Sequence, residues 1–187
     1  MGKLLHKKKI KTPYPIIDVK ALSGENRIIN YTQCKKFVSY LTYKNWFRNG
    51  HPIEGDILLS TVGSLAEMKI FYGSIGCIAQ NVVAFRCKEI SNLYMYQYLK
   101  HIRNEIISYD IGSVQPSIKV TQVIKKNILI PSKSIEQRFH VLMNAISNQI
   151  YKSEMQSVQL QNVRDTLLPK LMSGEIRVPM EVAEQEN

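Results

Sequence analysis

The sequence lacks several features that indicate particular classes of protein. It has only three cysteines, Cys34, Cys77 and Cys87, and no two of them form a CxxC pair. This number and spacing support neither a disulfide framework nor a zinc cage, so we expect reduced, buried thiols. No run of about 18 apolar residues is available to span a bilayer, and no apolar signal core follows Leu4 and Leu5. We therefore expect a cytoplasmic protein without a membrane partner.

Acidic residues are also few in relation to basic ones. The chain has 25 Lys and Arg against 15 Asp and Glu, which gives a formal net charge of +10. The tail 179–187 holds three Glu and no base, so the preceding residues together carry +13. The first 50 residues contain 11 of the Lys and Arg but only two acids. Such a surplus favours a polyanionic partner such as nucleic acid.

The patterns that are present predict an α+β domain followed by a long projecting helix. Short apolar runs at 16–20, 57–62, 66–72 and 75–86 are separated by turn residues and predict strands. Ser91 is expected to cap an amphipathic helix of about five turns that ends before Gly112, and a further strand is expected at 127–130. We predict a target-recognition domain at 1–131, a long helix with its cap at 132–178, and an acidic tail at 179–187.

The last quarter of the chain carries clear helix boundary signals. Ser134 with Gln137 three residues later fits a capping box, and Gly174 supplies the left-handed residue that ends a helix. Pro169 cannot donate a backbone hydrogen bond, so we expect the straight helix to end near Leu168, with at most a bent final turn to Ser173. This helix would have 35 residues and a length of about 52 Å.

One face of this helix carries a seam of apolar residues with a polar centre. A helix of this length needs a partner, and we expect a second copy of the chain, with the polar centre fixing register where the two helices cross. The alternative is that the segment packs on its own domain and its polar positions face water. The seam residues are Phe139, Leu142, Ile146, Gln149, Ser153, Gln156, Leu160, Val163 and Leu167.

The stretch 31–49 interleaves basic and aromatic residues, a composition suited to DNA contact. Lysine and arginine pair with phosphates or guanine edges, asparagine and glutamine read adenine, and tryptophan stacks or wedges. The basic arm Lys7, Lys8, Lys9 and Lys11 would add nonspecific phosphate contacts. The alternative is a half-buried hairpin with solvated lysines. The candidate DNA-binding residues are Lys35, Lys36, Lys44, Asn45, Trp46, Arg48 and Gln115.

Four motifs in order resemble those of the DNA-specificity subunits of type I restriction–modification systems. They are GDILLSTVGS at 55–64, GSVQPSI at 112–118, ILIP at 128–131 followed by IEQR at 135–138, and LLPKLMSGEI at 167–176. The resemblance implies a non-catalytic subunit that binds double-stranded DNA and assembles with modification (methyltransferase) subunits and a restriction or motor subunit. It also implies that S-adenosylmethionine, ATP and Mg²⁺ belong to those partners and not to this chain.

The sequence departs from that family's usual pattern. The family's subunits resemble two recognition domains in tandem, each followed by a long helix, whereas this sequence has one of each and lacks the expected tryptophan-led opening strand. It looks like a half-subunit whose homodimer would read an interrupted palindrome. A chain truncated from a longer subunit would have the same sequence.

Rival functions remain open at this point. Asp56 with Glu67 and Lys69 resembles the carboxylate and lysine arrangement of metal-dependent nucleases. Single-stranded nucleic-acid binding through the aromatic and basic stretch, or a purely structural coiled-coil adaptor, are further alternatives. We favour the non-catalytic reading, with no catalytic and no metal-binding residue.

Overall fold

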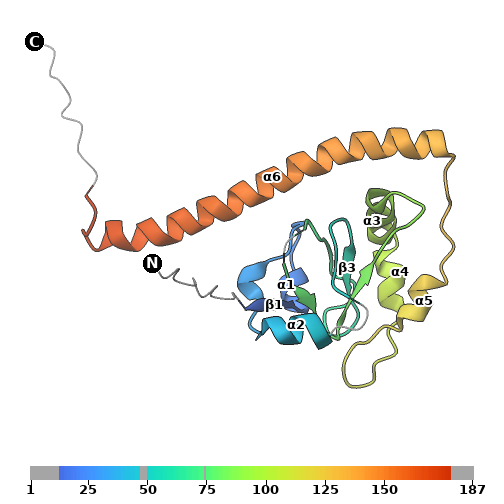
Figure 1. The fold of residues 1–187 in the computed structure, drawn as a ribbon, viewed down its shortest axis with the longest axis horizontal. Helices are drawn as coiled ribbons and strands as arrows, with labels where there is room; N and C mark the ends of the chain where they lie inside the picture. The colour runs from blue at the N-terminus through green and yellow to red at the C-terminus, as the bar shows by residue number, and fades with distance from the viewer. Residues whose placement is uncertain (1–12, 47–49, 74, 178–187) are drawn as a thin grey trace, which may run out of the picture. The chain divides into compact units, whose positions relative to one another are not determined.

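The structure is a computed structural model that describes residues 13–46, 50–73 and 75–177 (Figure 1). The chain divides into a globular unit, described from 13 to 146, and a helical unit, described from 147 to 177. The expected α+β class with a long helix is confirmed. In chain order the elements are β1 (Tyr14–Ile17), α1 (Val19–Leu22), the 3-10 helix η1 (Tyr31–Gln33), β2 (Phe37–Val38), α2 (Tyr40–Trp46), β3 (Ile57–Ser60), β4 (Met68–Ile70), β5 (Cys77–Ile78), β6 (Val82–Phe85), α3 (Asn92–His101), α4 (Arg103–Ser108), α5 (Val120–Ile124) and α6 (Lys133–Met172).

The strands form two small sheets in the globular unit. In the first, β1 lies between β2, to which it is antiparallel, and β5, to which it is parallel. In the second, β3 lies between β4 and β6 and is antiparallel to both. The strands of the second sheet pair over more residues than those of the first, and its central strand β3 is completely buried.

The two hydrophobic cores meet at β3, because successive side chains of a strand point to opposite faces. Ile57 and Leu59 belong to a core that α3 and α4 complete with residues such as Tyr96 and Ile106. Leu58 points to the other face and belongs to the core built around α1 and β1. One short strand therefore holds both halves of the globular unit together.

The predicted strand at 16–20 is shifted in the structure. Strand β1 ends at Ile17, and Asp18 then caps α1 by accepting hydrogen bonds from the backbone N–H of Lys20 at 3.0 Å and Ala21 at 3.4 Å. A side chain that satisfies backbone donors in this way begins a helix where the apolar pattern alone suggests more strand. The runs at 57–62, 66–72 and 75–86 do contain strands, each shorter than predicted.

The predicted five-turn helix after Ser91 is divided in two. Ser91 is the N-cap of α3 as expected, but the backbone turns at Ile102 between α3 and α4. The predicted strand at 127–130 is wrong. Its carbonyl groups accept hydrogen bonds from tyrosine hydroxyls of α3, Tyr98 to Asn127 at 2.8 Å and Tyr94 to Leu129 at 2.7 Å, in place of a strand ladder.

Helix α6 has 40 residues, a length of about 60 Å. It begins at Lys133, so Ser132 and not Ser134 occupies the capping position, and the Ser132 carbonyl accepts the Glu136 N–H. The final turn allowed beyond Leu168 is present, and α6 ends at Met172. Pro169 removes a single N–H, and the helical pattern continues with Ser173 N–H donating to the Pro169 carbonyl at 2.9 Å. Gly174, at φ 74°, follows the helix end as predicted.

Within the described residues, α6 and every shorter helix lack the apolar length needed to cross a bilayer.

Candidate nucleic-acid interface

Four of the predicted DNA-binding residues lie close in sequence around β2 and α2. Lys35 and Lys36 precede β2, and Lys44 and Asn45 lie on α2; all four side chains are exposed. The Lys36 carbonyl accepts the Ile16 N–H at 2.9 Å, which ties this segment to β1. The charged groups are therefore displayed on an anchored backbone. Arg48, the basic arm and the side chain of Trp46 lie outside the described residues.

A stack of aromatic rings holds α2 against the first sheet. The Tyr43 ring lies 4.0 Å from the Tyr14 ring on one side and 3.5 Å from the His51 ring on the other, measured between centroids. The His51 Nε2 atom is also 2.8 Å from the Tyr43 carbonyl oxygen. Burial raises the pKa of Tyr43. Tyr43 thus serves to position α2 and is not available to stack on a base.

Gln115 lies on a different segment, the loop 110–118. Its amide nitrogen lies 3.6 Å from the point where a Cβ on Gly63 would be, which is an ordinary van der Waals distance, so the φ of 86° and not the glutamine favours glycine at position 63. Gln115 is exposed, and in Figure 1 this loop and α2 both lie along the lower side of the globular unit in that view. Asp110 lies two residues before Gly112 and accepts its N–H, an arrangement typical of an Asx turn that the Asp-x-Gly spacing indicates.

The three residues of the nuclease alternative have separate partners. Asp56 is buried and accepts hydrogen bonds from Arg86, at 3.0 Å to one carboxylate oxygen and 2.8 Å to the other, and from the Ile53 N–H at 2.9 Å. The hydrogen bond to Asp56 raises the pKa of Arg86. The Asp56 carboxylate is therefore committed to an ion pair and a turn.

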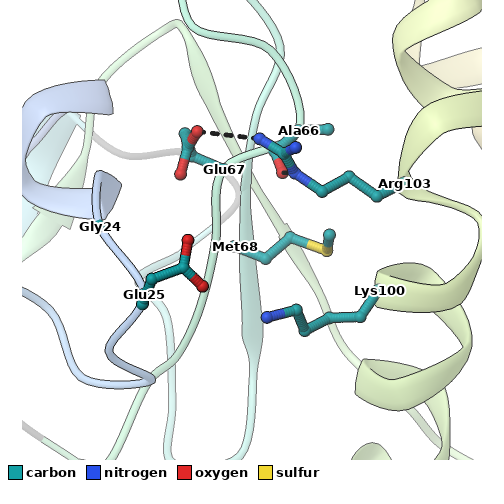
Figure 2. Close-up of a pocket in the computed structure, with 7 residues that line it drawn as sticks. All are labelled: Gly24, Glu25, Ala66, Glu67, Met68, Lys100 and Arg103. Atoms are coloured by element: carbon teal, nitrogen blue, oxygen red, sulfur yellow. Dashed lines mark hydrogen bonds and ion pairs between the residues drawn. The ribbon is translucent and has the colours of Figure 1, made fainter.

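Glu67 and Lys69 are also occupied by structural contacts. Glu67 pairs with Arg103 at 3.0 Å (Figure 2). Lys69 is buried on β4, and its ammonium donates to the carbonyls of Gly24, at 2.6 Å, and Asn26. In the part of the chain that the structure describes, no group of three or more His, Cys, Asp and Glu is arranged to hold a metal ion. The geometry does not support the nuclease arrangement.

A pocket of about 220 Å³ lies between the loop after α1, the start of β4, and helices α3 and α4. Figure 2 shows the residues that line it. Two acids, Glu25 and Glu67, and two bases, Lys100 and Arg103, line it. Their charges offset one another, so this hollow does not provide the single-sign surface that a nucleic-acid backbone requires. The exposed bases around α2 fit that requirement better.

The predicted seam on α6 is largely exposed in a single chain. Phe139 is the exception, because its ring packs edge-on against Tyr94 of α3 with centroids 5.8 Å apart. The polar centre is exposed as well. The exposed apolar members are Leu142 at 61%, Ile146 at 42%, Leu160 at 62%, Val163 at 53% and Leu167 at 41%, and the polar members are Gln149, Ser153 and Gln156.

The chain is similar to type I restriction–modification specificity subunits both in sequence and in fold. A specificity subunit of the type I restriction enzyme MjaIX from Methanocaldococcus jannaschii is 31% identical over 111 residues, which cover 52% of this chain and 26% of that protein. A type I restriction–modification S subunit from M. genitalium has a similar fold, with a TM-score of 0.50, 17% identity, and coverage of 92% of this chain and 42% of that one. An HsdS subunit from Thermoanaerobacter tengcongensis gives a TM-score of 0.39 at 14% identity, covering 94% of this chain and 42% of that one.

This chain thus spans less than half the length of each of these relatives. The family model described as type I restriction modification DNA specificity domain matches residues 2–160, most of the chain. This match covers the basic segment around β2 and α2, the loop 110–118 and the first part of α6. It confirms the family resemblance and includes the first three of the four motifs, whereas the motif at 167–176 lies beyond residue 160. The chain belongs to the family of type I restriction modification DNA specificity domains.

Proposed function

We propose that the globular unit binds double-stranded DNA and reads one half of a bipartite site for a type I restriction–modification complex. The match of residues 2–160 to the DNA specificity domain carries this proposal. The exposed Lys35, Lys36 and Lys44, and the net charge of +10, support it because phosphate contacts dominate affinity for DNA. Asn45 and Gln115, both exposed amides, are the candidates for base reading.

The proposed complex divides its chemistry between subunits. This chain would select the site and recruit modification and restriction subunits, which would carry S-adenosylmethionine, ATP and Mg²⁺. The carboxylates Asp56 and Glu67 are held in ion pairs with Arg86 and Arg103, which is consistent with a non-catalytic role for this chain.

The proposed arrangement also includes two copies paired through α6. Leu142, Ile146, Leu160 and Val163 repeat at three-residue and four-residue helical spacing and expose between 42% and 62% of their surface. Two apolar blocks on one face of a long helix, separated by the polar centre of the seam, are the pattern of a helix that packs against another helix in a defined register. A pair would carry two globular units, one for each half of the site.

The DNA-binding proposal is tested by a salt titration of the full chain with labelled duplex DNA, followed by fluorescence anisotropy. Removing a phosphate contact with Lys36→Ala or Lys44→Ala should weaken binding to all sequences alike and lower the magnitude of the salt slope by about one per residue. Lys152→Ala removes the same charge from an exposed site on α6 and should leave the slope unchanged. Salt-independent binding, or no binding by the wild-type chain, would refute the proposal.

A further inference from the structure

Hydrogen bonds within the loop 110–118, made by the Asp110 carboxylate and by the backbone, hold this loop in one conformation. One carboxylate oxygen of Asp110 accepts the N–H groups of Gly112 and Ser117, both at 2.8 Å, and the Ile111 N–H donates to the Ser117 carbonyl at 2.9 Å. These backbone hydrogen bonds lower the pKa of Asp110, so the carboxylate stays charged at neutral pH. The two ends of the loop are therefore clamped together.

The loop is also joined to the buried sheet. The Gly63 N–H donates to the Pro116 carbonyl at 2.9 Å, and the Ile118 N–H donates to the Thr61 carbonyl at 2.8 Å, directly after β3. A Cβ on Gly112 would lie 1.8 Å from the Gln115 carbonyl oxygen, so the chain can close this tightly only with glycine there. The tip of the loop is consequently a rigid projection on a fixed base.

The residue at that tip is an unburied valine. Val114 is 99% exposed, the largest value of any large hydrophobic side chain in the described part of the chain, and Ile111 on the same loop is 52% exposed. A rigid loop that presents an aliphatic side chain with no intramolecular contact is suited to enter another molecule. Because the loop is already ordered, insertion would require little additional ordering.

The neighbours of Val114 favour DNA over an apolar protein groove. Ser113 and Gln115 flank it with hydrogen-bonding side chains, and the exposed Lys119 follows the loop. The only acid in the segment 110–119 is Asp110, one oxygen of which is engaged by backbone donors. An apolar wedge beside amide and basic groups is the combination by which proteins part a base step while contacting its edges and phosphates.

We propose that Val114 is an apolar wedge that enters between base pairs of the target duplex and partly unstacks them, with Gln115 contacting the adjacent base edge. This inference rests on the proposed DNA-binding function and goes further, because it identifies a residue and a deformation of the DNA. It makes the loop 110–118 a second contact region in addition to the segment around α2.

The test measures unstacking separately from binding. Duplexes that the full chain enriches from a random-sequence pool are remade with 2-aminopurine at successive positions, whose fluorescence rises when the base loses its stacking neighbours. No modification subunit is present, so base flipping by that subunit does not contribute. The wild-type chain should raise the fluorescence at one step of the site.

Two variants of Val114 and one control decide the outcome. Val114→Ser should abolish the fluorescence rise and weaken binding about tenfold, whereas Val114→Ile should retain both. Leu129→Ser, at a side chain that is 83% exposed on another segment, should behave as the wild type. Because Val114 has no intramolecular contact to lose, these variants should fold normally.

Each contrary result has a distinct meaning. Salt-dependent binding without any fluorescence rise, or a rise that persists in Val114→Ser, overturns the wedge and leaves DNA binding standing. If Val114→Ser instead weakens association with a methyltransferase subunit while DNA fluorescence is unchanged, the tip is a protein contact and the wedge is also overturned. Absence of DNA binding by the wild-type chain refutes the proposed function itself.

Discussion

At the scale of residues, Glu136 connects the first turn of α6 to the start of α3. Its carboxylate accepts the buried Ser91 N–H at 2.6 Å and the Lys133 ammonium at 2.8 Å. One turn later, His140 Nδ1 lies 2.8 Å from the Ser91 hydroxyl. The hydrogen bond from Lys133, followed by that from Ser91, holds the pKa of Glu136 below its ordinary value of 4.5. The charged form of Glu136 therefore stabilises this junction.

This pKa shift predicts a pH dependence of stability. A carboxyl group whose pKa is lowered by folding contributes stability above its unfolded value and loses it as pH falls through the folded value. The wild-type free energy of unfolding should therefore fall below about pH 4.5 more steeply than that of Glu136→Gln. Urea unfolding of both proteins between pH 7 and pH 3 measures this difference, and parallel curves would contradict it.

Lys69 provides a second prediction at this scale. Its buried ammonium donates to the carbonyls of Gly24 and Asn26 and so holds the loop after α1 to strand β4. Lys69→Met keeps the aliphatic volume but leaves these acceptors without their charged donor, which should lower the free energy of unfolding by about 2 kcal/mol. Urea unfolding checks this, with the exposed Lys119→Met as control. A stability equal to that of the wild type would show that the contact contributes nothing.

The sequence permits only part of this site to be predicted. The exposed lysines of the segment 31–46 follow from charge and composition, and they are exposed as long basic side chains usually are. Lys69 is a lysine of the same kind by sequence, yet it is buried because the loop 24–26 supplies carbonyl partners from 43 and 45 residues away. The proposed role of Val114 depends on the hydrogen bonds that close the loop 110–118 and leave this side chain exposed. The residues next to Val114 in the sequence do not indicate that exposure.

At the scale of elements, α6 shows which signals are reliable in a sequence. Its existence and apolar face follow from helical periodicity, and its end from Gly174. Its exact first residue does not, because Ser132 and Ser134 are equally suitable caps by residue type and tertiary contacts of Glu136 decide between them. Phe139 fits the seam by spacing but packs on Tyr94, since a neighbouring element can use any residue near the edge of an apolar face.

The apolar seam of α6 predicts the effect of charge on assembly. Leu160→Glu with Val163→Glu would place two carboxylates in the proposed helix pairing, where they would have to be buried without partners, and should yield monomers. Light scattering coupled to size-exclusion chromatography measures the mass. Gln161→Glu with Asn162→Glu adds the same charge beside the seam and should leave a dimer. A wild-type monomer, or an unchanged dimer in the seam variant, would contradict pairing through this face.

At the scale of the whole molecule, the order of the parts is predictable and the strand pairing is not. Composition and periodicity indicate a basic α+β domain followed by a helix. The parallel pairing of β1 with β5 joins Ile16 to Cys77 across about 60 residues, and the pairing of β3 with both β4 and β6 likewise depends on contacts distant in sequence. Local patterns contain no information on such partners, because each strand has only two to four residues.

Two copies joined through α6 would bind DNA differently from one. When one globular unit is bound, the second is held near the same duplex, so its binding becomes effectively intramolecular. A duplex with two inverted half-sites should therefore bind about 10²-fold to 10⁴-fold more tightly than a duplex with one.

Moving one half-site by about 5 base pairs turns it to the opposite side of the helix and should remove most of this gain. The Leu160→Glu, Val163→Glu variant should bind both duplexes equally. Anisotropy titrations of the three duplexes measure these affinities, and a wild-type protein that does not distinguish two half-sites from one would show that its two globular units do not act together.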